Sequence, residues 1–489
     1  MTLASKLRDP SLFVQLAAVG ADWIETGPAG ARIAVLDPAD GSTLGHVPEL
    51  DAAQTRLAVA AAEAAWPAWR ARPAQERADI LERWFDLMLA NADDLALIMT
   101  REQGKPLPEA RGEILYAASF VRWFAEEARR VRGETVPAPT ADRRIVVLRQ
   151  PVGVSAAITP WNFPAAMITR KCAPALAAGC TVIVKPSELT PFSALALAVL
   201  AQRAGLPPGV LNVVTGQPAE IGGALTAELA VRKLSFTGST AVGRLLMRQC
   251  ADSVKRLSLE LGGNAPFIIF EDADLDAAIA GVMASKFRNA GQTCVCANRI
   301  LVQEGIHNAF LDRLAGAVEQ LRVGEGTEPG VTIGPLITEA ATNKVLGHVE
   351  DALAHGAMAV VGGGRHARGG QFVQPTVLVG ATTDMRLANE ETFGPVAPVF
   401  RFRTEEEAIR IANATPYGLA AYFYTENLRR SWRVAEALEF GMVGLNTGSV
   451  SMEVAPFGGV KQSGLGREGS HLGMDEYLEV KAFHVGGLA

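Results

Sequence analysis

The sequence predicts an α/β protein whose 489 residues contain two successive runs of alternating strand and helix. In the first run, from Val152 to about residue 251, short apolar segments alternate with stretches of helical periodicity, a pattern typical of a parallel sheet. A second alternation of the same kind begins after residue 263. The segment 134–151, with a turn-rich connection at 137–142 and a strand-like stretch at 144–148, interrupts the helices before the first run and predicts a hairpin or an arm.

Residues 1 to about 130 contain an irregular entry followed by helices. Apolar residues recur at helical spacing over 52–66 and 74–90, and Asp51 and Pro73 are suitable starting residues for these helices. A further amphipathic helix is predicted at 109–131. Its aromatic side chains lie on one side of the helix, and such a stripe more often packs in a core than binds a ligand.

The later elements follow from the same patterns. The first run predicts strands at 154–159, 181–185, 210–215 and 233–237, separated by helices near 165–178, 193–204, 219–229 and 241–251. The second run predicts strands at 267–270, 299–302, 359–361 and 396–402, with a helix at 306–321. Parallel sheets of this kind bind ligands beyond the carboxyl ends of their strands.

Composition excludes several classes of protein. The 46 basic and 52 acidic residues give a net charge of −6, so we expect no general affinity for nucleic acid or for acidic membranes. Five cysteines in this length do not form a disulfide framework, which indicates a reducing compartment. The sequence shows neither a signal peptide nor an apolar segment of membrane-spanning length. A cytoplasmic location is the expectation.

Two cysteines, Cys294 and Cys296, stand one residue apart behind small and amide residues. Because a thiolate is a strong nucleophile and the preceding Gly-Gln-Thr leaves room beside the sulfur, Cys294 is the candidate for covalent chemistry. A buried structural thiol is the alternative. The Cys-x-Cys spacing has no second ligand pair and the seven histidines are scattered, so no metal site is expected.

Two segments at strand ends are candidates for binding a nucleotide. At 236–243, Gly238 and Ser239 stand where a strand passes into a helix, and free N–H groups there favour a phosphate. An ordinary helix cap is the alternative. At 184–188, Lys185 and Glu188 can donate to and accept from ribose hydroxyls, although many loops carry such charges.

Two further segments can complete a catalytic site. Asn162, held between an aromatic residue and prolines, is suited to donate to an oxyanion; a structural turn is the alternative. Glu260 lies in an apolar, glycine-flanked setting in which a raised pKa would suit a general base. A solvated carboxylate at a helix-to-strand corner is the other interpretation.

Together these segments resemble the aldehyde dehydrogenase superfamily. The motifs at 160–164, 185–188, 236–243, 260–263, 291–294 and 391–395 occur in the order and at the approximate spacing of that family, and the likeness runs from about Pro38 to Val485. The Cys294–Cys296 pair and the segments 163–171, 285–299 and 446–459 most resemble the succinate-semialdehyde dehydrogenase branch.

The resemblance implies a covalent mechanism. Cys294 attacks the aldehyde, the Asn162 amide and the Cys294 N–H hold the oxyanion of the thiohemiacetal, and a thioester remains after hydride transfer to a nicotinamide. Glu260 then activates water, and Lys171 and Glu468 match positions associated with proton transfer. One donor of this kind is worth ~3 kcal/mol of the barrier.

The resemblance also assigns the cofactor contacts. Glu391 matches the residue that holds the nicotinamide ribose, and Phe393 packs beside it. Trp161, Lys185, Ser187, Gly238 and Ser239 are expected to line the remainder. Glu188 lies next to the adenosine ribose, where a carboxylate accepts from a 2′-hydroxyl and repels a 2′-phosphate. NAD is therefore favoured, with NADP possible.

For the substrate, the resemblance implies succinate semialdehyde. Arg170 and Arg288 match the arginines that grip its carboxylate, with Ser451 as the accompanying hydroxyl and Phe163 and Phe457 as apolar walls. Structural ion pairs are the alternative for both arginines.

Other functions stay open at this point. Glutarate semialdehyde or another ω-oxo acid is the alternative substrate, because one methylene changes binding by only ~1–3 kcal/mol. A CoA-acylating enzyme would not need Glu260, a non-enzymatic scaffold would tolerate the loss of Cys294, and a thiol or metal module would leave the cofactor motifs unexplained.

The implied architecture has a Rossmann-like cofactor domain at 1–132 and 152–262, an α/β catalytic domain at 263–471, and a small β oligomerisation arm at 133–151 and 472–489. In the family such an arm pairs with another subunit, so a homodimer or a homotetramer is expected. Some members of the branch use a Cys-x-Cys pair as a redox switch, which makes Cys296 a candidate redox residue; a packed thiol is the alternative.

Overall fold

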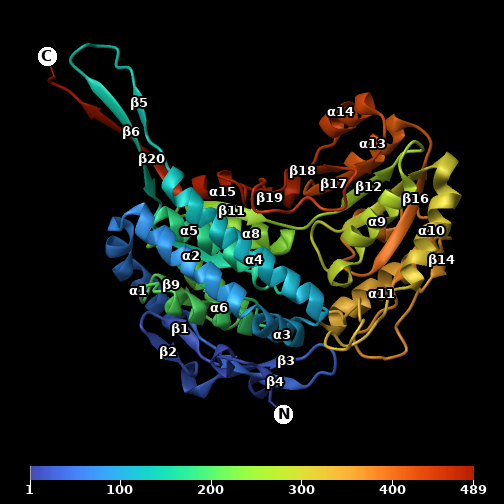
Figure 1. Cartoon of the computed structure of the whole chain (residues 1–489), viewed down its shortest axis with the longest axis horizontal. Helices are drawn as coiled ribbons and strands as arrows, with labels where there is room; N and C mark the ends of the chain where they lie inside the picture. Colours follow the sequence, from blue (N-terminus) through green and yellow to red (C-terminus); the bar gives the residue numbers. More distant parts are fainter. Residues whose placement is uncertain (1, 489) are drawn as a thin grey trace.

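The computed structural model describes residues 2–488 and contains four sheets, of eight, seven, three and two strands. Figure 1 shows the two large sheets in two bodies that lie side by side, with the three-stranded sheet projecting from the first body as an arm. The α/β class predicted from the alternation is confirmed.

The eight-stranded sheet has the order β19-β11-β10-β7-β8-β9-β1-β2. Its five central strands, β11 to β9, are parallel. The flanking strands β19 and β1 are antiparallel to them, and β2 pairs antiparallel with β1 at the edge. The strands are β1 (Ala17–Val19), β2 (Asp22–Ile24), β7 (Val154–Ile158), β8 (Thr181–Lys185), β9 (Leu211–Val213), β10 (Val231–Thr237), β11 (Arg256–Glu260) and β19 (Gly464–Leu465).

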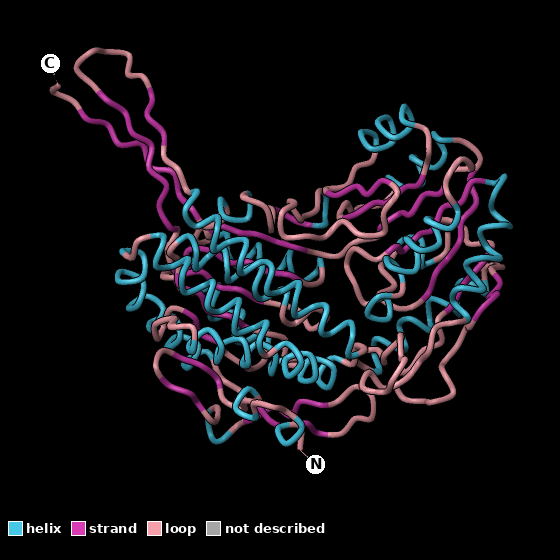
Figure 2. Tube along the Cα trace, in the orientation of Figure 1, coloured by secondary structure: helices cyan, strands magenta, loops and turns pink. Residues whose placement is uncertain are grey.

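Helices pack on both faces of this sheet (Figures 1 and 2). Those in contact with its strands are α1 (Ala52–Ala71), α5 (Ala166–Ala178), α6 (Pro191–Arg203), α7 (Pro218–Ala227) and α8 (Thr240–Ala251). A further helical layer, α2 (Ala74–Ala90), α3 (Ala92–Gln103) and α4 (Leu107–Glu127), packs against α5 and α6. Asp51 caps α1 as expected, since its side chain accepts from the N–H of Gln54. The aromatic stripe of α4 contributes Phe120 and Phe124 to the core, so the core interpretation holds for these two.

The predicted strands and helices of the first run are present within a few residues of their expected ends. The sequence interpretation missed α3, the short N-terminal strands and β11. The alternative interpretation of Glu260, at a helix-to-strand corner, is wrong, because Glu260 is the last residue of β11 and is paired in register with Thr237. The strand is short and its alternation of polar and apolar residues spans only five positions, which is too few to distinguish it from a loop.

The seven-stranded sheet has the order β14-β15-β16-β13-β12-β17-β18, and all of its pairs except β14–β15 are parallel. The strands are β12 (Ala265–Ile269), β13 (Ala297–Gln303), β14 (Met358–Val361), β15 (Thr376–Val379), β16 (Val396–Phe402), β17 (Ala420–Tyr424) and β18 (Met442–Leu445). The helices are α9 (Leu275–Lys286), α10 (His307–Glu319), α11 (Glu339–Ala354), α12 (Arg386–Asn389), α13 (Glu405–Asn413) and α14 (Leu428–Ala437).

The arm is an antiparallel sheet of β5 (Glu134–Val136), β6 (Arg144–Pro151) and β20 (Leu478–Val485). Segments far apart in the sequence thus form one structure that stands away from the rest of the chain (Figure 2). The predicted strand character of 144–148 is confirmed. Residues 472–475 form the short helix α15 (Leu472–Asp475), which packs near α5 and not in the arm.

The last part of the chain also returns to the first body, because Gly464–Leu465 pairs with β11 within the segment assigned to the catalytic domain. A separate two-stranded sheet, β3 (Arg32–Leu36) with β4 (Thr43–Pro48), lies near the N-terminus. The division into three domains with the boundaries given above stays a prediction.

Candidate active site

A cavity of about 260 Å³ lies where the two bodies meet. From the first body come the segments that follow the carboxyl ends of β7, β10 and β11, as expected for parallel strands. From the second body come the Cys294 loop and the segment 391–393. The lining residues predicted from the sequence are Trp161, Asn162, Phe163, Gly238, Ser239, Cys294, Glu391 and Phe393.

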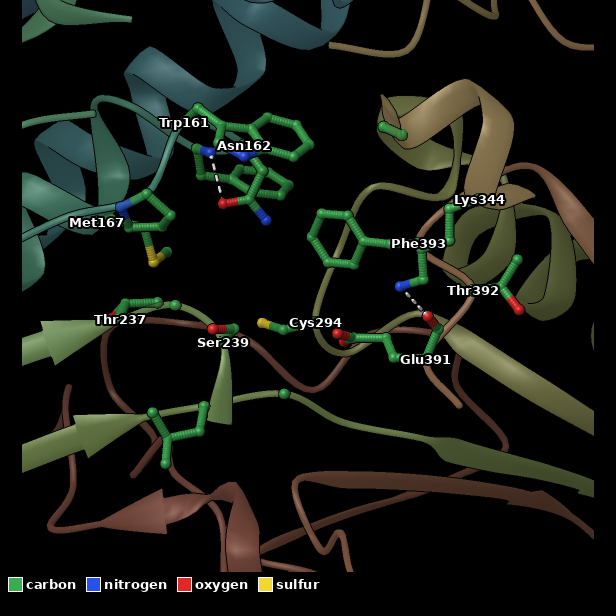
Figure 3. A pocket seen from close by; sticks show the side chains of 16 residues that line it. Trp161, Asn162, Met167, Thr237, Ser239, Cys294, Lys344, Glu391, Thr392 and Phe393 are labelled. Atoms are coloured by element: carbon green, nitrogen blue, oxygen red, sulfur yellow. Dashed lines mark hydrogen bonds between the residues drawn. The ribbon is translucent and has the colours of Figure 1, made fainter. Parts of the chain in front are cut away.

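Cys294 is delivered to this cavity by a strained loop (Figure 3). Asn289, Ala290 and Gly291 have φ values of 52°, 54° and 74°, so three successive residues are left-handed. Gly291 is needed here because a Cβ would lie 2.1 Å from the carbonyl oxygen of Gly394. The loop that carries Cys294 therefore packs directly against the segment that follows Glu391.

The thiol of Cys294 is held in its neutral form. Burial raises its pKa to about 12, with a further contribution from the charge of Glu391, while Arg170 and Arg288 act in the opposite direction. A proton acceptor is therefore required before the sulfur attacks a carbonyl carbon.

The side-chain amide of Asn162 makes two hydrogen bonds with main-chain groups of the protein. Its Nδ2 donates to the carbonyl oxygen of Gln292 at 3.1 Å, and its Oδ1 accepts from the N–H of Phe163 at 3.1 Å. The dashed line that ends at the Asn162 side chain in Figure 3 marks the second of these bonds. Since an amide nitrogen carries two hydrogens, one remains for a ligand oxygen in the cavity.

Glu260 lies in a buried cluster with Glu468, Lys171 and Arg170. Lys171 Nζ pairs with Glu468 and donates to Thr237 Oγ1 at 2.6 Å, and Arg170 Nη2 lies 2.9 Å from Glu468 Oε2. Burial, with the neighbouring charge of Glu468, raises the pKa of Glu260 well above its ordinary value. The solvated interpretation of Glu260 is wrong, because the side chain is 3% exposed.

The segment 236–243 is compatible with both interpretations that the sequence offers, an ordinary helix cap and a phosphate-binding helix start. Ser239 caps α8 by accepting from the N–H of Val242 at 3.3 Å. Gly238 leaves space that a side chain would fill, since a Cβ would lie 2.4 Å from the ring of Phe236. The helix start therefore keeps its other N–H groups and a glycine-lined approach for a ligand.

Glu391 and its neighbours close the cavity from the second body. Glu391 Oε1 accepts from the N–H of Gly263 at 3.2 Å, and burial raises the pKa of this carboxyl to about 7. The rings of Trp161 and Phe393 meet edge to face, with centroids 5.6 Å apart. Residues of the two bodies thus face each other across the opening (Figure 3).

Lys185 is the last residue of β8, the strand beside β7, and Ser187 and Glu188 follow it. None of the three is among the residues that line the cavity. Lys185 Nζ donates to Glu188 Oε2 at 2.7 Å, and Ser187 Oγ accepts from the N–H of Leu189 at 3.2 Å. Glu188 remains partly exposed and can accept from a ligand hydroxyl.

A second cavity, of about 310 Å³, contains Arg288 and Ser451 together with Glu109, Ser285 and Tyr422. Arg288 is exposed and has no ion pair within residues 2–488, and its guanidinium lies 5.2 Å from the ring centroid of Phe163. Phe163 lines the first cavity, and Val295, which follows Cys294, lines the second, so the two cavities are neighbours. This second cavity can hold an anionic group near Cys294.

Arg170 and Phe457 lie elsewhere. Arg170 is 1% exposed, with its guanidinium 3.8 Å from the ring centroid of Phe457, which is also buried. Neither residue lines the two cavities just described.

Cys296 is buried away from both cavities. Its Sγ accepts from Lys286 Nζ at 3.3 Å, and Lys286 is fully buried. Burial raises the pKa of Cys296, and Lys286 opposes this effect.

Several residues at the site were not found from the sequence. Thr237 binds Lys171, Lys344 Nζ donates to the carbonyl oxygen of Glu391 at 2.6 Å, and Lys105 donates to Asn162. Thr237 lies within the motif at 236–243, directly before Gly238, so the motif could have identified it. Lys105 lies in the turn between α3 and α4, and Lys344 lies inside α11 (Glu339–Ala354); nothing in the sequence around either residue indicates a site.

The comparisons with known proteins agree with this geometry. A model of the aldehyde dehydrogenase family matches residues 23–483. The chain belongs to the aldehyde dehydrogenase family. The resemblance deduced from the sequence is confirmed, and the fold and enzyme class follow with it.

Among curated relatives of this aldehyde dehydrogenase, the NADP-dependent succinate-semialdehyde dehydrogenase of Escherichia coli is 59% identical over 98% of this chain and 100% of its own length. A glutarate-semialdehyde dehydrogenase of Pseudomonas aeruginosa is 58% identical over 99% of this chain and 100% of its own. A crystal structure of succinate-semialdehyde dehydrogenase from Burkholderia pseudomallei has a TM-score of 0.97 at 62% identity, covering 98% of this chain and 99% of that chain. No helix within residues 2–488 is long and apolar enough to cross a membrane.

Proposed function

We propose that this aldehyde dehydrogenase oxidises succinate semialdehyde to succinate with a nicotinamide dinucleotide. The observation that carries the substrate is Arg288, an exposed cation without an ion pair in the described chain, which shares a cavity with Ser451 next to the Cys294 cavity. A short aldehyde with a distal carboxylate places its two ends in these two cavities. Arginine grips a carboxylate through two parallel N–H···O bonds.

The covalent steps belong to Cys294, Asn162 and Glu260. The Cys294 thiol gives up its proton to solvent as the sulfur adds to the aldehyde carbon, and the free amide hydrogen of Asn162 with the Cys294 N–H stabilises the oxyanion. Hydride loss leaves a thioester on Cys294. Glu260, with its raised pKa, takes a proton from the water that hydrolyses this thioester.

The proton then needs a route away from Glu260. Glu468 and Lys171 lie next to it and form a paired, buried chain to Thr237, so we assign them to proton transfer. Arg170 holds the second oxygen of Glu468, and it is the residue whose predicted contact with the substrate carboxylate most needs a test.

The residues present fit a dinucleotide. Gly238 and Ser239 at the start of α8 hold phosphate oxygens, and Glu391 accepts from ribose hydroxyls at the other end of the cavity. The bound cofactor supplies the acceptor for the hydride. Glu188, beside Lys185, sets the choice between the two dinucleotides, and its negative charge favours NAD over NADP.

Glutarate semialdehyde is the second candidate substrate. A relative with that name is 58% identical to this chain, within one percentage point of the Escherichia coli succinate-semialdehyde dehydrogenase at 59%. One added methylene changes the binding free energy by only ~1–3 kcal/mol. Both candidates share the distal carboxylate that Arg288 would bind.

We also propose that the enzyme is a homodimer or a homotetramer. Both outer strands of the arm, β5 and β20, have an unpaired edge, and the arm exposes Val136, Leu148, Val480 and Phe483. Such edges are usually covered. All five cysteines are free, which fits a reducing compartment such as the cytoplasm.

Steady-state kinetics test the assignment. The panel contains straight-chain ω-oxo acids of four, five and six carbons and the matching unsubstituted aldehydes, each with NAD and with NADP. We expect the highest kcat/KM for succinate semialdehyde with NAD. A butanal value equal to that of succinate semialdehyde would contradict the semialdehyde assignment, and a higher value for the five-carbon acid would favour glutarate semialdehyde.

A further inference from the structure

Lys105 is a buried cation that the proposed mechanism does not use. It lies in the turn between α3 and α4, and its side chain is 1% exposed. Its Nζ forms an ion pair with Glu113, donates to the main-chain carbonyl oxygen of Asn162 at 2.8 Å, and lies 4.0 Å from the ring centroid of Phe163. Two of these contacts are with the Asn162–Phe163 segment, and the third is with Glu113, which itself binds the residues that follow this segment.

Glu113, the ion-pair partner of Lys105, binds the residues that follow Phe163. Its second oxygen, Oε1, accepts from the N–H groups of Ala165 and Ala166 at 3.0 and 3.2 Å. These N–H groups open α5, whose N-terminus has no side-chain cap of its own. The Lys105–Glu113 pair therefore holds peptide groups on both sides of Phe163.

A second donor acts on the same carbonyl. Asn289 Nδ2 donates to the carbonyl oxygen of Asn162 at 3.1 Å. Asn289 belongs to the strained loop before Cys294, so the peptide of Asn162 is tied to the nucleophile on one side and to Lys105 on the other.

The turn that carries Lys105 is itself anchored to the second body. The N–H of Leu107 donates to the carbonyl oxygen of Gly326 at 2.9 Å. Gly104 has a φ of 92°, and a Cβ there would lie 2.8 Å from the ring of Pro335. The position of Lys105 is thus set by contacts from both bodies.

Such an arrangement is costly as a purely structural feature. A buried ion pair recovers its desolvation only with good geometry, and apolar replacements are often as stable. By contrast, an oxyanion donor works only when its direction is fixed before the reaction. The amide of Asn162 has just one hydrogen for the cavity, so its direction depends on the main chain that Lys105 holds.

We propose that Lys105, together with Glu113, is a positioning residue for the oxyanion amide of Asn162. The proposal rests on the proposed function, in which Asn162 stabilises the thiohemiacetal. Lys105 touches neither of the reacting groups, and it acts through the Asn162 peptide.

The test is a double-mutant cycle on the first turnover. The rate of the NADH burst at saturating NAD and substrate is measured by stopped flow for wild type, Lys105→Met, Asn162→Ala and the Lys105→Met/Asn162→Ala double variant. Misplacing a catalytic group by about 1 Å can cost ~100-fold, so we expect Lys105→Met to slow the burst by roughly 10–100-fold. In the Asn162→Ala background the same substitution should cost less than about twofold, because a residue acting through Asn162 has nothing left to position.

A control separates positioning from general damage. Alkylation of Cys294 by iodoacetamide needs a reactive sulfur but no oxyanion donor. Its rate should stay within about twofold of wild type in Lys105→Met, since groups that share no contact couple by only about 0.3–0.5 kcal/mol. Because Lys105→Met leaves Glu113 unpaired, Lys105→Met/Glu113→Gln is measured beside it and should show the same slow burst in a protein with no buried unpaired charge.

Four outcomes overturn the inference. They are a wild-type burst in Lys105→Met or in Lys105→Met/Glu113→Gln, equal losses from Lys105→Met with and without Asn162, or alkylation that falls in parallel with the burst. A normal burst in Asn162→Ala would overturn the oxyanion role itself, and so the failure of the proposed function is recognised separately.

Discussion

Arg170 Nη2 lies 2.9 Å from Glu468 Oε2, and both side chains are buried beside Glu260. Arg288, in contrast, is exposed and has no ion pair in the part of the chain that the structure describes. The two arginines that the sequence suggests for one carboxylate therefore stand in different surroundings. Their substitution should have different consequences.

Arg288→Ala should raise KM for succinate semialdehyde by roughly 10–100-fold, since a hydrogen bond to a charged group is worth about 1.5–3 kcal/mol. Butanal, which has the same length but no carboxylate, should be affected far less. Arg170→Ala is measured on the same two substrates. For Arg170→Ala, a loss confined to the semialdehyde would support the predicted contact of Arg170 with the substrate, whereas equal losses on both substrates would indicate that Arg170 acts through Glu468. For Arg288→Ala, equal losses on both substrates would weaken the semialdehyde assignment.

Cys294→Ala should abolish NADH formation, because no other thiol lines the Cys294 cavity. Glu260→Gln should keep a rapid first turnover and lose roughly 10²–10⁴-fold in steady-state rate, the usual contribution of a general base. The comparison is made with the enzyme at a concentration high enough to detect the NADH that each active site forms in its first turnover. A steady rate equal to that of wild type would remove Glu260 from deacylation.

The pH dependence of kcat should report the coupling between Glu260 and Glu468. Glu260 acts as a base only when ionised, and the charge of Glu468 raises its pKa. Glu468→Gln removes that charge and leaves Arg170 and Lys171 nearby, so the pKa of Glu260 should fall. The rising limb of the plot of kcat against pH should then move to lower pH, whether or not the maximal kcat changes. A limb that stays in place or moves to higher pH would show that another group controls deacylation.

Glu188→Ser should admit a 2′-phosphate by removing its repulsion and should leave Lys185 free to pair with it. We expect the ratio of kcat/KM with NADP to that with NAD to rise. Glu188→Gln serves as the matched control, since it removes the charge and keeps the size. If neither variant changes the ratio, Glu188 does not select the cofactor.

The redox role of Cys296 stays a prediction with a direct test. Peroxide would oxidise Cys294 to a sulfenic acid, which condenses with the Cys296 thiol to a disulfide and water. To react, Cys296 must leave Lys286. Dithiothreitol should restore activity in wild type and not in Cys296→Ala. Intact mass after peroxide should show a loss of two hydrogens; added oxygen, or equal recovery of the variant, would exclude the switch.

Much of the fold and part of the site could be predicted from local pattern. The alternation of apolar strands and amphipathic helices indicates a parallel sheet, and parallel strands bring the segments at 160–164, 238–239 and 260–262 to one edge. Cys294, Asn162 and Glu260 carry their chemistry in their own side chains and their immediate neighbours. For these residues the sequence was sufficient to name a role.

The sequence by itself determined the α/β class and the family, and it named the candidates for the nucleophile and the base, because each depends on residue type and spacing along the chain. Only the tertiary structure decided which charges are paired. Arg170 and Arg288 are alike in sequence, but packing buries one against Glu468 and leaves the other exposed. Lys105 reaches Asn162 from 57 positions away, a contact that exists only because the two bodies fix the turn between α3 and α4. Burial and pairing follow from contacts between distant segments, and these are what turn a charged side chain into a substrate anchor, a proton carrier or a support.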